Sequence, residues 1–297
     1  MRRGALYAAT AYALWGLFPL YFRLVSDIPA LEITAHRVMW SLAFMAVLMV
    51  ALRRTAWLRV ALADRHVMAT FIGSSVLLAA NWFIYVWAVT HGRVVEASLG
   101  YFINPLFNVL LGRLVLGERL APAQKVAVGL AASGVAWLAW QTGQVPWISL
   151  ALAASFGTYG LLRKRAPLGT LEGLTLESLL LGPLAAIGLL WVGVHGGTGF
   201  QHAGLSTQLL LAAAGPLTAV PLIFFGAAAQ RIPMSLLGML QYIGPTIQLA
   251  LGVGLFGEPF GGARLQGFVL IWTACAVFSA EMLWRHRPRD PVDAEPV

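Results

Sequence analysis

The chain has 297 residues, of which 59% are hydrophobic and 11% are charged, and its formal net charge is +8. A soluble domain carries about 25% charged and about 45–50% apolar residues, so this composition excludes an ordinary soluble fold and indicates a protein whose solvent is lipid. The single cysteine, Cys275, excludes a disulfide framework and a cysteine-based metal cluster.

Ten apolar segments approach the length of about 20 residues that a helix needs to cross a bilayer. The first of them is too long for the apolar part of a signal peptide, so we interpret it as a span. Short connections with turn-forming residues separate the segments, and long runs without alternation predict helices rather than barrel strands. The predicted spans cover residues 4–22, 31–52, 67–89, 95–115, 122–140, 146–162, 172–194, 207–229, 234–256 and 263–284.

Basic residues predict the orientation of the spans, because Lys and Arg collect in cytoplasmic segments of membrane proteins. With the N-terminus placed inside, 15 of the 20 Lys and Arg lie in inner segments. Only Arg23, Arg93 and Arg264 lie in outer segments, and Arg37 and Arg113 lie within spans. We therefore interpret the positive net charge as cytoplasmic loop charge, with both termini in the cytoplasm, and not as a nucleic-acid surface.

One stretch of the sequence occurs twice. Residues 101–119 read YFINPLFNVLLGRLVLGER, and residues 241–259 read QYIGPTIQLALGVGLFGEP. Pro105 aligns with Pro245 at an offset of 140 (245−105), and the Gly-Glu pair that closes each span follows at the same offset. Because the fourth span ends inside and the ninth ends outside, the two halves are predicted to be inverted relative to each other, an arrangement by which transporters build two states of similar energy.

The predicted fold is therefore an all-α integral membrane protein with ten transmembrane helices in two inverted five-helix repeats. The N-terminal repeat covers residues 1–141 and the C-terminal repeat covers residues 146–284. Residues 285–297 are polar and proline-rich, and we expect a disordered cytoplasmic tail there.

Polar side chains inside the spans mark the predicted substrate cavity, since polar groups in lipid are costly and face a cavity or one another. Tyr101, Asn104 and Asn108 follow a helical spacing and form one stripe, and Gln241 and Gln248 hold equivalent positions in the second copy. The alternative is that these amides only join packed helices. The residues predicted to line the cavity are Trp15, Asn81, Tyr85, Tyr101, Asn104, Asn108, Gln241, Tyr242 and Gln248.

Charged residues in the second and seventh spans are the candidates for coupling. Glu32 and His36 are four residues apart and share a helix face. Arg37 and Glu177 are related by the offset of 140 (177−37), so we expect the repeat axis to bring them together as an ion pair that gates or couples transport. The alternative is a structural pair near the membrane interface. His36 is the candidate proton-coupling group, because the unperturbed pKa of histidine is about 6.5.

Two prolines lie in mid-span. Pro105 and Pro245 each remove a backbone donor and are predicted to act as hinges, the alternative being static kinks. Glu118 and Glu258, which follow the repeated spans, are expected to terminate helices rather than to touch substrate.

Enzyme signatures are missing from the sequence. It contains no H-E-x-x-H, no G-x-S-x-G and no G-x-x-x-x-G-K-[ST]. We therefore predict no enzymatic activity, no cofactor and no metal site, and any uphill transport is expected to draw on a gradient.

Several blocks of sequence resemble a known family. They are AYALWGLFPLY at 11–21, HR at 36–37, NW at 81–82, HGRVVEASLGYFINP at 91–105, LGER at 116–119, LQYI at 240–243, PT at 245–246 and GEP at 257–259. They resemble the drug/metabolite transporter superfamily, specifically proteins with two EamA domains of the RarD branch, over nearly the whole chain apart from the tail. The resemblance implies a multi-pass permease of the inner (plasma) membrane, with some members linked by name to chloramphenicol sensitivity and no settled substrate.

Residues and resemblance together predict a secondary transporter that moves small amphipathic metabolites or drugs by alternating access, with proton coupling through His36 or Arg37 as a hypothesis. One alternative is an energy-uncoupled facilitator or channel, and the other is an intramembrane enzyme. The expected partners are a small-molecule substrate and the lipid bilayer, with no nucleic acid.

Overall fold

The computed structural model describes residues 1–297 except 92–93, 142–146, 196–199, 201–202, 256–261 and 286–297, and this described part is helical without strands. Its helices are α1 (Arg2–Gly16), α2 (Phe18–Leu24), α3 (Ala30–Ala51), α4 (Trp57–Ala63), α5 (Arg65–Thr90), α6 (Val94–Val115), α7 (Pro122–Trp140), α8 (Trp147–Arg165), α9 (Thr170–His195), α11 (Leu205–Ala229), α12 (Met234–Gln241), α13 (Ile243–Gly254) and α14 (Ala263–Arg285).

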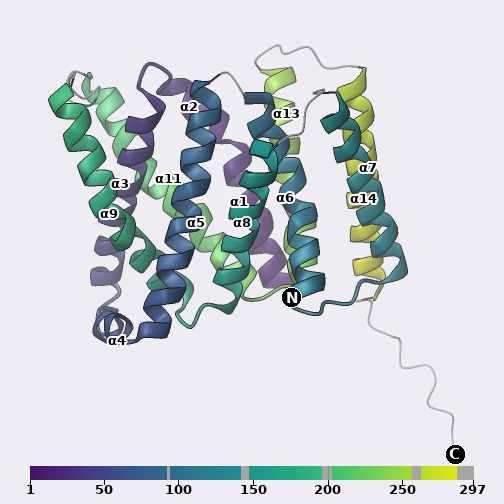
Figure 1. Cartoon of the computed structure of the whole chain (residues 1–297), viewed down its shortest axis with the longest axis horizontal. Coiled ribbons are helices and arrows are strands. Elements are labelled where there is room, and N and C mark those ends of the chain that lie inside the picture. The colour runs from purple at the N-terminus through teal and green to yellow at the C-terminus, as the bar shows by residue number, and fades with distance from the viewer. Residues whose placement is uncertain (92–93, 142–146, 196–199, 201–202, 256–261, 286–297) are drawn as a thin grey trace, which may run out of the picture.

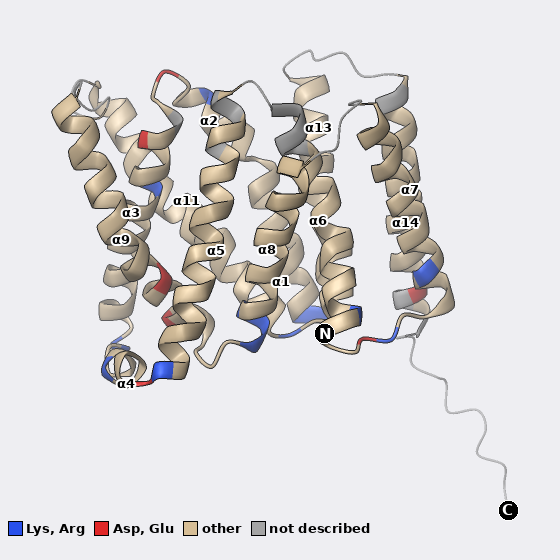
Figure 2. Ribbon diagram, viewed as in Figure 1, with Lys and Arg blue, Asp and Glu red and all other residues tan. Residues whose placement is uncertain are grey.

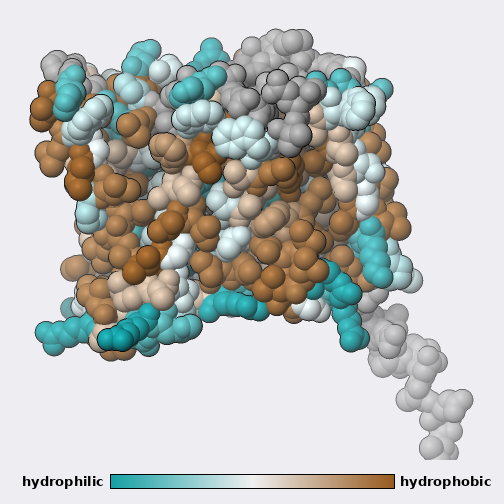
Figure 3. All heavy atoms as spheres, in the orientation of Figure 1, coloured by the Kyte–Doolittle hydropathy of each residue, from teal (hydrophilic) through white to brown (hydrophobic). Residues whose placement is uncertain are grey.

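Six helical segments within the described residues are long and apolar enough to cross a membrane, and two shorter apolar helices accompany them. The long helices run side by side (Figure 1), and apolar residues form a belt across the middle of the visible face, between more hydrophilic edges (Figure 3). On α6, Leu110 and Leu114 are exposed while Val109 is buried. Helices that are apolar on most of their circumference suit a site between lipid and other helices, so this fold is that of an integral membrane protein.

Two predicted spans are interrupted rather than continuous. The first is split at Leu17 into α1 and α2, and Pro19 stands in the first turn of α2. Proline cannot donate the amide hydrogen bond that would reach the residue four positions earlier, which here is Trp15. The Gln248 side chain donates to the Trp15 carbonyl instead, at 3.3 Å, so a residue of α13 joins this break.

The ninth predicted span is split at Tyr242 into α12 and α13, and Pro245 lies in the first turn of α13. By contrast, α6 continues unbroken through Pro105. The two prolines therefore sit in different local structures, and their role as hinges stays a prediction.

Contacts between helices link the two halves of the chain closely. α7 packs against α14, α3 packs against α9 and α11, α1 packs against α11, α12 and α13, α6 packs against α8 and α12, and α5 packs against α8 and α9. α7 and α14 form one end of the molecule in Figure 1, with α9 at the other end.

α3 and α11 pack tightly at Gly215. A Cβ atom on Gly215 would collide with the carbonyl group of Trp40 and would lie 2.6 Å from the Trp40 Cβ. At the same place Ser41 Oγ donates a hydrogen bond to the Gly215 carbonyl at 3.1 Å. Only glycine lets the two backbones come this close.

We expect Gly215→Ala to destabilise the protein by about 1–3 kcal/mol, because the added methyl group meets backbone that cannot move aside. The midpoint of thermal unfolding of the purified protein measures this effect. Gly188→Ala is the matched control, since no atom lies within 4 Å of that added Cβ. Equal unfolding midpoints for the two variants would contradict the assignment of Gly215 to a tight contact.

Candidate functional site

Arg37 lies among aromatic rings between α2, α3, α5 and α11. Its guanidinium carbon is 5.7 Å from the ring centroid of Phe18, 5.8 Å from that of Phe22 and 5.2 Å from that of Trp82. Its Nε donates a hydrogen bond to Thr218 Oγ1 at 3.0 Å. Within the described part of the chain, no carboxylate lies within ion-pair distance of this guanidinium.

Tyrosines extend this aromatic environment. The rings of Tyr85 and Tyr101 are 6.2 Å apart, and both side chains are near enough to Arg37 to interact with it electrostatically. Tyr101 is 41% exposed although α6 packs against α8 and α12. We call Phe18, Phe22, Arg37, Trp82, Tyr85 and Tyr101 the Arg37 cluster.

The predicted ion pair between Arg37 and Glu177 is wrong. Glu177 instead pairs with Arg163, with 3.8 Å between Arg163 Nη1 and Glu177 Oε1, and both side chains are 1% exposed. The sixth predicted span ended before Arg163, but α8 continues to Arg165, so Arg163 stays helical and points inward.

Helix direction explains why the predicted partners do not meet. The Arg54–Glu172 contact, at 3.3 Å, places the end of α3 beside the start of α9, so the two helices run in opposite directions. Arg37 and Glu177 each lie seven residues from the start of their helix, about 10 Å along it. Arg37 and Glu177 therefore lie at different depths in the membrane, one toward each side.

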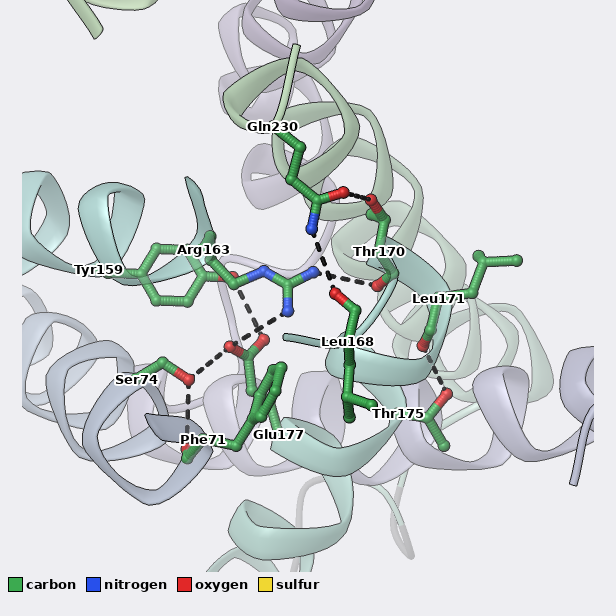
Figure 4. A network of polar contacts seen from close by, with 10 residues as sticks. All are labelled: Phe71, Ser74, Tyr159, Arg163, Leu168, Thr170, Leu171, Thr175, Glu177 and Gln230. Carbon is green, nitrogen blue, oxygen red and sulfur yellow. Dashed lines mark hydrogen bonds and ion pairs between the residues drawn. The ribbon is translucent and has the colours of Figure 1, made fainter. Parts of the chain in front are cut away.

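A polar network surrounds the Arg163–Glu177 pair (Figure 4). Ser74 Oγ donates to Glu177 Oε1 at 2.6 Å, and the Tyr159 hydroxyl donates to Glu177 Oε2 at 3.3 Å. Arg163 Nη2 donates to the Thr170 carbonyl at 3.0 Å. Both carboxylate oxygens thus have donors, which a buried charge requires. Because Tyr159 and Arg163 are four residues apart, their shared helix face was a signal in the sequence that the prediction missed.

A small cavity, lined mostly by apolar side chains, lies between this network and the Arg37 cluster. Its volume is about 10 Å³, close to the minimum that holds one water molecule. Glu177, Ser178, Ser41 and Thr218 supply its polar lining. Thr218 also accepts the hydrogen bond from Arg37, so one cavity touches both the Arg37 hydrogen bond and the Glu177 carboxylate.

The amide stripes lie in helix contacts. Asn108 Nδ2 donates to Gln241 Oε1 at 3.2 Å, and the Tyr242 hydroxyl donates to the Phe102 carbonyl at 3.1 Å, so α6 is joined to the α12–α13 region. Asn104 is buried, at 3% exposure, and its Oδ1 has no hydrogen-bond partner among the described residues. This conformation agrees with the packing alternative, while a cavity-lining role in another conformation stays a prediction.

The other predicted cavity residues are also placed. Asn81 Nδ2 donates to the Leu152 carbonyl and to Ser155 Oγ, both at 3.0 Å, so Asn81 joins α5 to α8. The Trp15 ring lies 5.7 Å from the rings of Phe156 and Phe225. These contacts place both residues at helix interfaces.

His36 faces away from the Arg37 cluster, since neighbouring residues of a helix point about 100° apart. Its Nε2 is 3.7 Å from Glu32 Oε1, and its ring lies 4.9 Å from the Phe200 ring. The Phe200 amide donates to Glu32 Oε1 at 3.0 Å. The structure does not bring His36 and Arg37 to a common site. No group of three or more His, Cys, Asp or Glu that could hold a metal occurs among the described residues.

Known proteins with similar sequences include several that are named transporters. Residues 2–140 match the EamA-like transporter family. The chain is 48% identical to an "uncharacterized transporter" of Pseudomonas aeruginosa over 98% of its own length and 97% of the relative's. It is also 48% identical to "Protein RarD" of Streptomyces exfoliatus, over 95% of this chain and 90% of that one.

A solved crystal structure is similar to this one, with a TM-score of 0.72 and 23% sequence identity. The match covers 95% of this chain and 99% of the solved chain, and it supports the fold alone. The sequence matches extend over nearly the full length at levels that establish common family membership, and they agree with the apolar helical fold. The chain belongs to the EamA-like transporter family, in its RarD branch.

Proposed function

We propose that the protein is a secondary transporter that moves small amphipathic metabolites or drugs across the inner membrane by alternating access. Membership of a family whose relatives are named transporters supports a membrane transporter of the drug/metabolite superfamily. The mechanism, the coupling and the substrate class are our inference from the geometry.

The single observation that carries this proposal is the symmetry of the helix contacts. The proposed repeats are residues 1–141 and 146–284, with ten spans formed by α1–α2, α3, α5, α6, α7, α8, α9, α11, α12–α13 and α14. Each helix of one repeat can be replaced by its counterpart in the other repeat. The α1–α11 contact then becomes α8–α5, the α3–α11 contact becomes α9–α5, and the α6–α8 contact becomes α13–α1. All six of these contacts are present. Contacts of this kind support inverted repeats that can rock against each other.

Charge distribution supports the proposed orientation. Most Lys and Arg residues of the described part gather at the lower edge of the molecule (Figure 2), where the chain also starts. The positive-inside rule assigns this edge to the cytoplasm, with both termini there. The proposed disordered tail, residues 285–297, lies outside the described residues apart from Arg285.

Contacts at that edge join the halves and support a state closed toward the cytoplasm. Arg165 Nη2 donates to the Val115 carbonyl at 2.9 Å, so it ties α8 to the end of α6. Glu118 accepts a hydrogen bond from the Met234 amide at 2.6 Å, so it ties the segment after α6 to α12. Alternating access requires these contacts to break when the cytoplasmic side opens.

Transport is tested by incubating proteoliposomes with a metabolite extract and identifying the accumulated solutes by mass spectrometry. We expect at least one amphipathic solute to enter faster than it enters protein-free liposomes and to be recovered unaltered. Absence of any such solute would overturn the proposal. A chemically converted product would favour the intramembrane-enzyme alternative.

Proton coupling is tested with the solute found in that screen. We expect His36→Gln to abolish the acceleration of flux by an imposed pH gradient while exchange at equal pH persists, because the charge-changing group has been removed. His66→Gln is the control, since His66 is exposed at the start of α5. If neither His36→Gln nor Arg37→Gln alters gradient-driven flux, coupling through these residues is wrong and the energy-uncoupled facilitator is favoured.

A further inference from the structure

Two of the described arginines, Arg37 and Arg163, point into the helix bundle, and their charges have different surroundings. Arg163 is fully buried and has an internal carboxylate partner, Glu177. Arg37 is only partly buried, and no described carboxylate pairs with it. A cation kept inside a membrane protein without a counter-ion is costly and usually marks a functional site.

The hydrogen bond to Thr218 leaves one edge of the Arg37 guanidinium available. A guanidinium has five N–H donors in a planar fork, and the Nε donor is taken by Thr218 at 3.0 Å. The Nη1 and Nη2 donors have no hydrogen-bond partner in the described part of the chain. Two parallel donors of this kind match the two oxygens of a carboxylate.

The rings of the Arg37 cluster indicate which organic group the carboxylate-bearing solute carries. Phe18, Phe22 and Trp82 lie within 5.8 Å of the guanidinium carbon, and the Tyr85 and Tyr101 rings adjoin them. Aromatic faces and edges favour contact with another flat ring. Tyr101, at the edge of the cluster, is 41% exposed.

Among the described residues, the acidic side chains of α3 and α9 nearest the cluster are already engaged. Glu177 pairs with Arg163, and Glu32 accepts a hydrogen bond from the Phe200 amide on the His36 side of α3. Among the described side chains, the charge that Arg37 offers to an incoming solute is therefore positive. A cationic solute would be repelled there, and a neutral one would leave the guanidinium without a counter-ion.

We propose that Arg37 binds the carboxylate of the transported solute, and that the substrate class is organic monocarboxylates with a flat aromatic group. This inference rests on the proposed transport function, because it takes the Arg37 cluster as part of the solute pathway. Thr218 acts as a positioning residue that holds the guanidinium with its free edge toward the solute.

Binding is tested with the full chain in lipid nanodiscs and three probes that share one body: 3-phenylpropionate, its amide and 3-phenylpropylamine. We expect the carboxylate to quench tryptophan fluorescence and raise the unfolding temperature, and the amide and amine to do neither. Arg37→Gln should weaken carboxylate binding at least tenfold, Arg37→Lys should weaken it less, and Thr218→Val should weaken it without abolishing it. Arg231→Gln is the matched control, since the Arg231 guanidinium carbon also lies over an aromatic ring, 5.7 Å from the Tyr7 ring centroid, but Arg231 is two residues beyond the end of α11.

Equal binding of the amide, unchanged binding in Arg37→Gln, or no binding of any probe to the wild-type protein would each overturn the proposal. Arg37→Lys keeps the charge and guards against a variant that fails to fold, which size-exclusion chromatography reports. Failure of the transport proposal is distinguishable. If the transport proposal fails, the carboxylate binds at Arg37 but does not cross a proteoliposome membrane. If only the carboxylate site is wrong, the protein transports neutral solutes and Arg37→Gln leaves that transport unchanged.

Discussion

Replacement of Arg163 by Met is expected to lower the free energy of unfolding by about 3–5 kcal/mol, because it leaves the buried Glu177 carboxylate without its cation. Both side chains are 1% exposed, so water does not replace the lost partner. Denaturation in detergent, followed by tryptophan fluorescence, measures the change. Arg59→Gln is the control for loss of one positive charge, since Arg59 is exposed on α4.

A second substitution separates charge from packing. In Arg163→Met/Glu177→Gln the neutral amide still bonds with Ser74 and Tyr159 but no longer needs a counter-ion. We expect the double variant to be more stable than Arg163→Met. With the single variant Glu177→Gln completing the double-mutant cycle, we expect a favourable coupling energy between the two residues. Strictly additive losses would show that the pair does not stabilise the fold as a unit.

Replacement of Glu118 by Ala is expected to cost about 2–4 kcal/mol, because buried amide donors at the start of α12 lose their acceptor. The Glu118 carboxylate accepts from the Met234 amide at 2.6 Å, the Ser235 amide at 3.0 Å and Ser235 Oγ at 2.8 Å. The residue that precedes α12 is Pro233, whose side chain cannot cap the helix. Gly117, with φ of +67°, lets the chain turn so that Glu118 reaches these donors.

Hydrogen exchange distinguishes this capping role from a general loss of stability. We expect the amides of Met234 and Ser235 to exchange faster in Glu118→Ala before the protein unfolds globally. Glu118→Gln keeps one acceptor oxygen and should show a smaller effect. Unchanged exchange at both amides would contradict the capping assignment. Glu258, the counterpart of Glu118, lies outside the described residues.

Glu118 was predicted to terminate a helix, and in the structure it does act at a helix end. The helix that it caps, α12, could not be predicted from the sequence. The sequence indicates where a helix ends, since Gly117 interrupts an apolar run. It does not indicate that the carboxylate serves a helix that begins 116 residues later, at Met234. Long-range capping depends on how two helix ends meet in space, and no local pattern encodes that.

Helix continuity was likewise only partly predictable. Apolar runs identified the segments that became α3, α5 and α9, whereas the runs that became α1–α2 and α12–α13 were broken at Leu17 and Tyr242. Three other helices continue through internal prolines, at Pro105 in α6, Pro183 in α9, and Pro216 and Pro221 in α11. Proline removes the same hydrogen bond in each case, so the presence of a proline does not by itself predict a break.

The sequence by itself determined the class of the protein, the approximate positions of its apolar helices and its family, because these depend on composition and on residues near one another in the chain. It also singled out Arg37 as an arginine within a span. Only the tertiary structure decided that Glu177 pairs with Arg163 and that Arg37 keeps a free edge among aromatic rings. The physical reason is that partner choice depends on depth and on helix rotation. Residues related by the offset of 140 lie at matching depths from opposite edges, and a pair forms only between side chains whose helices present them to each other.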